Sequence, residues 1–182
     1  MTVQLDVVGL LMTRGGERYG EVVTQLQHAL QCAALARAEH ADDDLVLAAL
    51  LHDVGHLIPG AASDTVDAHH GHRGAVLLRP FVSPRLAWLV SHHVAAKRYL
   101  CTVDAHYAAD LSPASRRSLE LQGGLLDHDA RVRLEGEAWL ADALRIRRWD
   151  DLAKVRDAAV PPLSAYLELL RQRFGPQTLP TD

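Results

Sequence analysis

The side chains with the clearest chemical potential are histidines, and two of them flank an aspartate in the segment LLHDVGH at residues 50–56. The chain has 11 histidines among 182 residues, most of them between His28 and His106. An apolar helix should not carry His52 and Asp53 unless both are satisfied, because burying unpaired polar groups is costly. A carboxylate can bridge two cations through its two oxygens, while each histidine offers one nitrogen to one metal. This pair is therefore predicted to be the centre of a two-metal site.

Further histidines and carboxylates have spacings that suit such a centre. His28 lies on a helix face away from the apolar stripe. His93 precedes Lys97 by one helical turn, so the ammonium can reach an anion bound at a metal. His70 opens the pattern HxxxGA, and Asp150 stands in the second half of the chain. These positions indicate metal chemistry that an isolated His-Asp pair would not.

The pattern H…HD…H…H…D resembles the HD superfamily of helical proteins over about residues 17–150. The resemblance implies a bridging role for Asp53 and six metal ligands: His28, His52, Asp53, His70, His93 and Asp150. Alternatives remain within three short segments. His69 or His72 could replace His70, His92 could replace His93, and Asp151 could replace Asp150.

Longer segments resemble a narrower branch, the HD oxygenases of phosphonate degradation. They are YGEVVTQLQHALQ, AALLHDVGH, HHVAAKRYL, LSPASRRSLELQGG and IRRWD. The resemblance implies a mixed-valent Fe(II)/Fe(III) pair and O2-dependent cleavage of a 1-hydroxyphosphonate to a carboxylic acid and phosphate. The substrate would be 2-amino- or 2-trimethylammonio-1-hydroxyethylphosphonate, giving glycine or glycine betaine, or else hydroxymethylphosphonate. The donor types suit iron, manganese and zinc equally.

The same resemblance assigns residues to substrate binding. It implies that the phosphonate is bound by His56, Lys97, Ser115 and Arg147, and that the catalytic residues are Asp53, His56 and Lys97. Glu21 would face the amino end of the substrate. Where the members that act on 2-amino-1-hydroxyethylphosphonate have a tyrosine three residues before this glutamate, the chain has Arg18, with Tyr19 next to it. The aromatic residues near the motifs that could surround an ammonium group are Tyr19, Tyr99, Tyr107 and Trp149.

Two other classes of function compete with the oxygenase. A metal-dependent HD phosphohydrolase acting on a nucleotide or another phosphoester would use a similar two-metal centre, which activates water and stabilises a leaving oxygen. A non-catalytic HD module of a signalling protein is disfavoured, because the ligand set is complete and Lys97 and Arg147 are both present.

Periodicity predicts an all-α fold, and the resemblance implies an HD-domain helical bundle that forms one domain over residues 1–182. The core is expected at about 17–174, with a disordered tail at 175–182. Helices are predicted at about 21–39, 43–57, 71–83, 84–100, 113–122, 127–146 and 163–174. A polar loop is expected at 60–71. No segment alternates with a period of two, so no sheet is expected.

The composition is that of an ordinary globular protein. Hydrophobic residues make up 48% of the chain and the formal net charge is −4, which gives no electrostatic case for nucleic acid or an anionic membrane. Neither a signal peptide nor a membrane span is expected. Cys32 and Cys101 are widely separated and are expected to be reduced thiols of a cytoplasmic protein.

Overall fold

The computed structural model describes residues 5–18, 22–59, 64–177 and 179, and of 64–68 only the backbone. The described residues form α-helices and one 3-10 turn and contain no β-strand. The helices are α1 (Val7–Arg14), α2 (Gln25–Ala38), α3 (Asp43–Leu51), α4 (Val54–Leu57), α5 (Asp64–Leu78), α6 (Pro84–Val103), α7 (Ala105–Asp110), α8 (Pro113–Leu121), α9 (His128–Glu135), α10 (Leu140–Leu152) and α11 (Leu167–Phe174), with the 3-10 turn η1 at Leu163–Tyr166. The predicted all-α class is confirmed.

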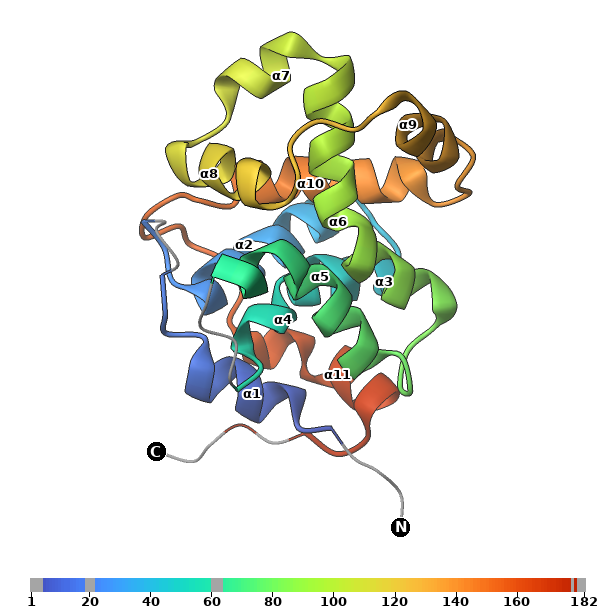
Figure 1. Cartoon of the computed structure of the whole chain (residues 1–182). Coiled ribbons are helices and arrows are strands. Elements are labelled where there is room, and N and C mark those ends of the chain that lie inside the picture. The colour runs from blue at the N-terminus through green and yellow to red at the C-terminus, as the bar shows by residue number, and fades with distance from the viewer. Residues whose placement is uncertain (1–4, 19–21, 60–63, 178, 180–182) are drawn as a thin grey trace.

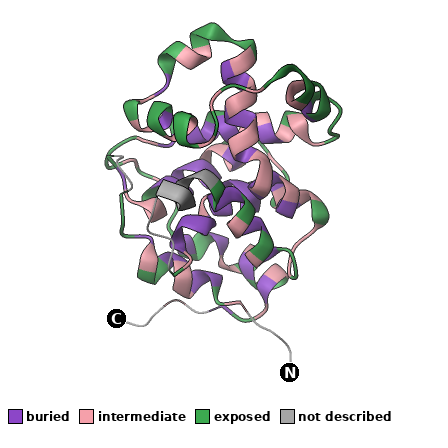
Figure 2. Ribbon diagram, viewed as in Figure 1, coloured by how far each residue is buried: buried purple, intermediate pink, exposed green. Residues whose placement is uncertain are grey.

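The central helices form the body of the protein and enclose an aliphatic core (Figure 1). The long helix α6 runs from the middle of the bundle to its upper end, where α7, α8 and α9 lie, while α1 and α11 lie at the lower end (Figure 1). Buried residues gather on the central helices (Figure 2). The largest of them include Trp149 and Tyr166, each at most 1% exposed, packed among leucines.

The His-Asp pair interrupts the helix that was predicted to run over 43–57. The α3 helix ends at Leu51, and α4 begins at Val54. Asp53 lies between them with φ −97° and ψ 7°, outside the helical region. On a continuous helix, adjacent side chains would point about 100° apart. The break re-aims Asp53, so that both side chains of the pair face one centre.

The predicted loop at 60–71 is wrong from residue 64 onward, because α5 begins at Asp64 and already includes His70 and Gly71, and residues 60–63 lie outside the described residues. Small residues let this helix approach its neighbours closely. A Cβ on Gly55 of α4 would lie 1.9 Å from the backbone oxygen of His70, and a Cβ on Gly71 would lie 3.1 Å from that of Val90 in α6. The position of His70 is therefore fixed by contact between backbones.

The other differences from prediction are one broken helix, two helices that were not predicted and an ordered residue in the tail. The helix predicted over 127–146 is two helices, because α9 ends at the C-cap Gly136 and α10 begins at Leu140. Helices α1 and α7 were not predicted. Within the tail that was expected to be disordered, Gln177 is 1% exposed and its side chain bonds to the backbone of Leu5 and Val8.

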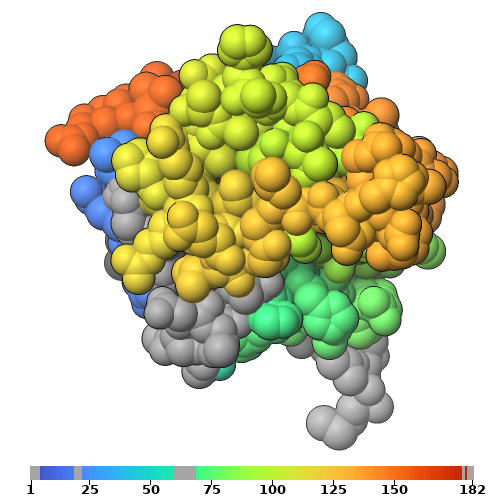
Figure 3. Space-filling model, turned by 45° about the horizontal axis from the view of Figure 1, so that its top comes forward, coloured from blue at the N-terminus to red at the C-terminus, as the bar shows by residue number. Residues whose placement is uncertain are grey.

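The space-filling view shows that α6 to α9 form one continuous face (Figure 3).

Candidate metal centre

Asp53 lies between two pairs of histidines, one pair on each carboxylate oxygen. Its Oδ1 is 3.2 Å from Nε2 of His70 and 3.4 Å from Nε2 of His93. Its Oδ2 is 3.5 Å from Nε2 of His52 and 3.8 Å from Nε2 of His28. The donor atoms of Asp53, His70 and His93 all lie within 4.8 Å of one another. This is the arrangement that a carboxylate bridging two cations requires.

The spacing within each histidine pair fits ligands of one ion. The two Nε2 atoms are 2.8 Å apart in His70 and His93 and 3.3 Å apart in His28 and His52. Two nitrogens bound at right angles about 2.1 Å from one metal would lie about 3 Å apart. The donor chemistry and the spacing therefore both fit two metal ions.

Backbone carbonyls select the ring nitrogen that faces the centre. Nδ1 of His28 lies 2.9 Å from the carbonyl oxygen of Ala153. Nδ1 of His52 lies 2.9 Å from the carbonyl oxygen of Ala49. Nδ1 of His93 lies 2.8 Å from the oxygen of Val90. A carbonyl can only accept, so each of these Nδ1 atoms carries the proton and donates it. The Nε2 lone pairs are then available to a metal, as is usual in metal-binding histidines.

Asp150 completes the side of the centre next to α2. Its Oδ1 is 3.3 Å from Nε2 of His28, and its Oδ2 is 3.9 Å from Nε2 of His52. Arg147, one turn earlier in α10, donates from Nη1 to Oδ2 of Asp150 and from Nη2 to Asp151. Its Nε also donates to the hydroxyl of Tyr107 at 2.9 Å. Arg147 therefore holds Asp150 in place.

Burial and neighbouring groups set the charges in the centre. Burial alone would raise the pKa of Asp53, but His52, His70 and His93 lower it well below its usual value. The carboxylate is therefore ionised. Burial lowers the pKa of His93 to about 4 and that of His56 to about 3, and in both cases the neighbouring His70 adds to the effect. Both rings are neutral at physiological pH.

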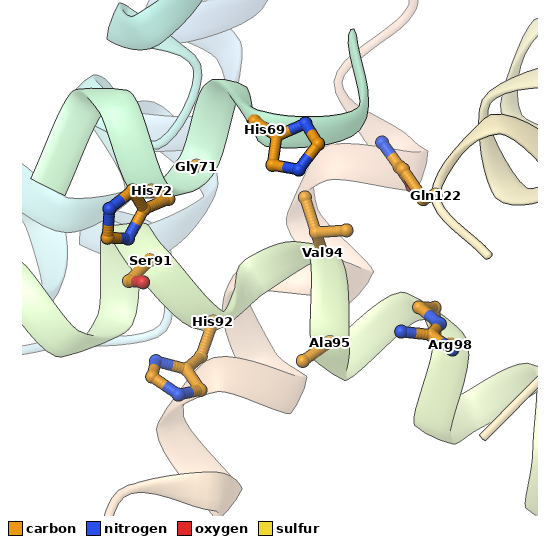
Figure 4. Close-up of a pocket in the computed structure, with 9 residues that line it drawn as sticks. All are labelled: His69, Gly71, His72, Ser91, His92, Val94, Ala95, Arg98 and Gln122. Carbon is orange, nitrogen blue, oxygen red and sulfur yellow. The ribbon is translucent and has the colours of Figure 1, made fainter. Parts of the chain in front are cut away.

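The alternative histidines point elsewhere. His69, His72 and His92 line a surface pocket of about 250 Å³ between α5 and α6 (Figure 4). The His92 ring stacks on Trp88 at a centroid distance of 4.0 Å, and its Nδ1 donates to the Trp88 carbonyl. By contrast, His70 and His93 are 4% and 2% exposed. The geometry thus favours His70 and His93 as ligands over their neighbours.

All four residues expected to bind the phosphonate are buried. Lys97 is 3% exposed and its Nζ donates to Ser118 Oγ at 2.6 Å. Ser115 is 5% exposed, but its backbone N–H donates to Ser112 and is not available to an anion. The His56 ring stacks on His70 with centroids 4.0 Å apart. Lys97 and Ser115 are therefore interior residues, not surface groups.

The residues expected near an amine are only partly described. Glu21 and Tyr19 lie outside the described residues, whereas Arg18 is exposed. Tyr99 donates its hydroxyl to Glu135, and Trp149 donates its indole N–H to Glu39. Tyr99 and Trp149 are therefore bonded to groups away from the metal centre.

Sequence reasoning missed the place of two side chains that border the centre. Cys32, treated as an ordinary thiol, has its Sγ 3.8 Å from Nε2 of His28, one turn earlier in α2. Tyr107, expected only as an aromatic residue near an ammonium group, donates its hydroxyl to Asp151 at 2.6 Å, beside Arg147. The spacing of four residues from His28 to Cys32 was a signal for the first. No comparable signal pointed to the bond between Tyr107 and Asp151, because the two residues are distant in sequence.

Within the described chain, no helix combines the length and hydropathy needed to cross a membrane.

Comparison with known proteins agrees with the geometry. Hydroxymethylphosphonate dioxygenase of Gimesia maris is 43% identical over 162 residues, which cover 86% of this chain and 81% of that protein. The glycine-betaine-forming [1-hydroxy-2-(trimethylamino)ethyl]phosphonate dioxygenase of Leisingera caerulea is 37% identical over 158 residues, 84% of this chain and 81% of that one. A third relative, uncharacterized protein L432 of Acanthamoeba polyphaga mimivirus, is 31% identical over 180 residues, 94% of this chain and 82% of that one.

The family-level match covers the whole candidate centre. The HD-domain model aligns with residues 26–153, a span that includes the six expected ligands from His28 to Asp150. Clustered histidines and aspartates at those positions suit metal binding. The chain therefore belongs to the HD-domain family.

Proposed function

We propose that this protein is a metal-dependent oxygenase that cleaves the C–P bond of a 1-hydroxyphosphonate. The observation that carries the proposal is the placement of Asp53 between two histidine pairs, in a chain whose relatives include two hydroxyphosphonate dioxygenases. The reaction consumes one O2 and yields a carboxylic acid and phosphate. Hydroxymethylphosphonate, for example, would give formate and phosphate, which together contain all the atoms of the substrate and O2.

The proposed cofactor is a pair of iron ions in the Fe(II)/Fe(III) state. On one side of the bridging Asp53, His28, His52 and Asp150 would hold one ion. On the other side, His70 and His93 would hold the second. The iron pair would supply the one-electron chemistry with O2 that amino-acid side chains lack.

The chain's own residues would bind and orient the phosphonate. Lys97 offers a buried ammonium one turn from His93, and Ser115 offers a hydroxyl. His56 is neutral, so it would act as a hydrogen-bonding partner and not as a cation. Arg147 belongs to the same proposed binding set and also holds Asp150. Their burial excludes water and strengthens each of these electrostatic contacts.

The candidate substrates differ in the substituent that they carry. One relative is named for hydroxymethylphosphonate and the other for [1-hydroxy-2-(trimethylamino)ethyl]phosphonate. We propose that Glu21 faces the amino group whenever the substrate carries one. Arg18 stands where the 2-amino-1-hydroxyethylphosphonate enzymes have a tyrosine, which favours a substrate preference that differs from theirs.

The proposed location is the cytoplasm. Cys32 and Cys101 are both free thiols, as is usual in a reducing compartment.

The experiment compares substrates on iron-loaded protein. Hydroxymethylphosphonate, its 2-amino- and 2-trimethylammonio-ethyl analogues and a set of nucleoside monophosphates are each assayed for phosphate release. We expect release from at least one hydroxyphosphonate. Asp53→Ala should lose both metals and all activity, whereas Asp129→Ala on the exposed face of α9 should behave as wild type. Release from nucleoside monophosphates alone would identify a phosphohydrolase, and full metal content in Asp53→Ala would refute the bridge.

A further inference from the structure

The hydroxyl of Tyr107 is bonded to two residues beside the metal centre. It accepts from Nε of Arg147 at 2.9 Å and donates to Oδ2 of Asp151 at 2.6 Å. Tyr107 belongs to α7, at the upper end of the bundle (Figure 1), whereas both partners belong to α10. Asp104, the N-cap of α7, accepts from the backbone N–H of Tyr107 at 3.1 Å and so fixes the first turn of this helix. The aromatic residue that was expected near an ammonium group thus uses its polar end to bind α10.

The guanidinium of Arg147 is held along one edge and points its third nitrogen at the metal centre. Asp151 accepts from Nε at 3.1 Å through Oδ2 and from Nη2 through Oδ1, so both of its oxygens bind the same edge. Tyr107 accepts from the same Nε and donates to the same oxygen of Asp151. The third nitrogen, Nη1, donates to Oδ2 of the proposed ligand Asp150. Because the guanidinium is planar and rigid, fixing its Nε–Nη2 edge also fixes where Nη1 points.

This orientation matters for an anion that Arg147 would bind. An arginine side chain has much rotamer freedom to lose, so an anion that must first order it binds more weakly than one that meets it already held. Asp151 supplies most of the contacts to the edge, but its side chain is 25% exposed, against 4% for that of Arg147. The bond from Tyr107 holds this partly solvated carboxylate against the arginine. Tyr107 therefore supports the arrangement at its most exposed point.

We propose that Tyr107 is a positioning residue, whose hydroxyl fixes Asp151 and one edge of Arg147 and so keeps Nη1 directed at Asp150 and at a phosphonate bound beside it. This inference rests on the proposed function, in which Arg147 belongs to the phosphonate-binding set. An aromatic cage for an ammonium group would need the ring of Tyr107, whereas positioning of Arg147 needs the hydroxyl. Loss of the hydroxyl should therefore weaken every phosphonate alike, whether or not it carries an ammonium group.

The test measures binding to the metal-loaded full chain by calorimetry. The probes are methylphosphonate and 2-(trimethylammonio)ethylphosphonate, which share the phosphonate group and differ in the ammonium group. Tyr107→Phe keeps the ring and should weaken both about 10-fold, the lower end of the loss that follows removal of a group that orients a ligand. Tyr107→Leu should weaken both by a similar factor. Tyr99→Phe is the matched control, because it removes a hydroxyl that donates to Glu135 away from the centre, and it should bind both probes as wild type does.

A second measurement separates positioning of Arg147 from a purely structural role. Lysine has one nitrogen and lacks the edge that Asp151 and Tyr107 hold. Adding Tyr107→Phe to Arg147→Lys should therefore cause little further loss of methylphosphonate affinity, as expected for two residues that act through one contact. Metal content and thermal unfolding are measured for every variant. If Arg147→Lys does not fold, Arg147→Met replaces it, and if neither folds, the comparison of Tyr107→Phe with Tyr99→Phe decides alone.

Several results would overturn the inference. They are unchanged affinity for both probes in Tyr107→Phe, weaker binding of the trimethylammonio probe alone in Tyr107→Leu, a full further loss in the double variant, no binding of either probe by the wild type, and failure of both Tyr107 variants to fold. The proposed function is judged separately, by phosphate release. Binding of both probes that depends on Tyr107, in a protein that releases phosphate from no hydroxyphosphonate, would support the role of Tyr107 and refute the proposed function. Phosphate release with unchanged probe binding in Tyr107→Phe would do the reverse.

Discussion

Gly55 offers a sharp test of how the fold positions the metal centre. A methyl group at this position would lie 1.9 Å from the backbone oxygen of His70 and 2.7 Å from its carbonyl carbon. Such contacts are essentially never closer than 3.0 Å, so α4 and α5 would have to separate by about 1.1 Å. Metal–ligand distances tolerate only about 0.2 Å. Gly55→Ala should therefore move His70 out of reach of the ion that it shares with His93.

The expected result is a folded protein that has lost one metal ion selectively. Overpacking should cost about 1–3 kcal/mol of stability, partly offset because alanine favours a helix by about 1 kcal/mol over glycine. Affinity for the second ion should fall at least about 100-fold, the upper range for perturbing a ligand's support. The assay is a Mn²⁺ titration with metal analysis and thermal unfolding. Gly16→Ala is the control, since a Cβ there meets nothing within 4 Å. Two tightly bound ions in Gly55→Ala would refute this reasoning.

Three further predictions address individual side chains. First, burial holds the pKa of His56 at about 3 in the folded protein, against about 6.5 when unfolded, so its contribution to stability is lost as pH falls below about 6.5. By linkage the loss is about 1.4 kcal/mol at pH 5.5. The free energy of unfolding of metal-free His56→Gln, measured with denaturant, should therefore fall by about that much less than that of the metal-free wild type as the pH is lowered to 5.5. An equal fall in both proteins would contradict the pKa shift. Second, His93→Ala should lose one metal ion whereas His92→Ala should retain both, as metal analysis can show, and the reverse result would exchange their roles. Third, Glu21→Ala should lower kcat/KM for aminated hydroxyphosphonates by 10-fold or more, about one charge-assisted hydrogen bond, and spare hydroxymethylphosphonate; a uniform loss would make Glu21 structural.

The residue types of the candidate centre could be predicted from sequence because metal ligands are chemically distinctive. His52 and Asp53 stand out in an apolar segment, and the structure brings them together with the other expected donors. The break between α3 and α4 that aims them could not be predicted, because the segment has helical periodicity throughout. The close contact of Gly55 with α5 is tertiary, so local periodicity does not reveal it.

The polar surroundings of the centre were less predictable than the ligands. Arg147 was expected to meet the phosphonate, yet its described partners also include Asp150, Asp151 and Tyr107. Tyr107 was expected only as an aromatic residue near an ammonium group, because no local spacing links its hydroxyl to Arg147. Pairings across more than 30 residues, such as Tyr107 with Asp151, depend on how helices pack and not on local spacing.

The most direct test of the proposed chemistry is the dependence of phosphate release on O2. Protein loaded with iron to the same content is supplied with hydroxymethylphosphonate in air and under strict anaerobiosis, and phosphate release and O2 uptake are measured together. An oxygenase that splits the C–P bond consumes one O2 for each phosphate and releases none without O2. Equal phosphate release in both conditions, with no O2 uptake, would contradict the oxygenase and indicate hydrolysis at the same centre.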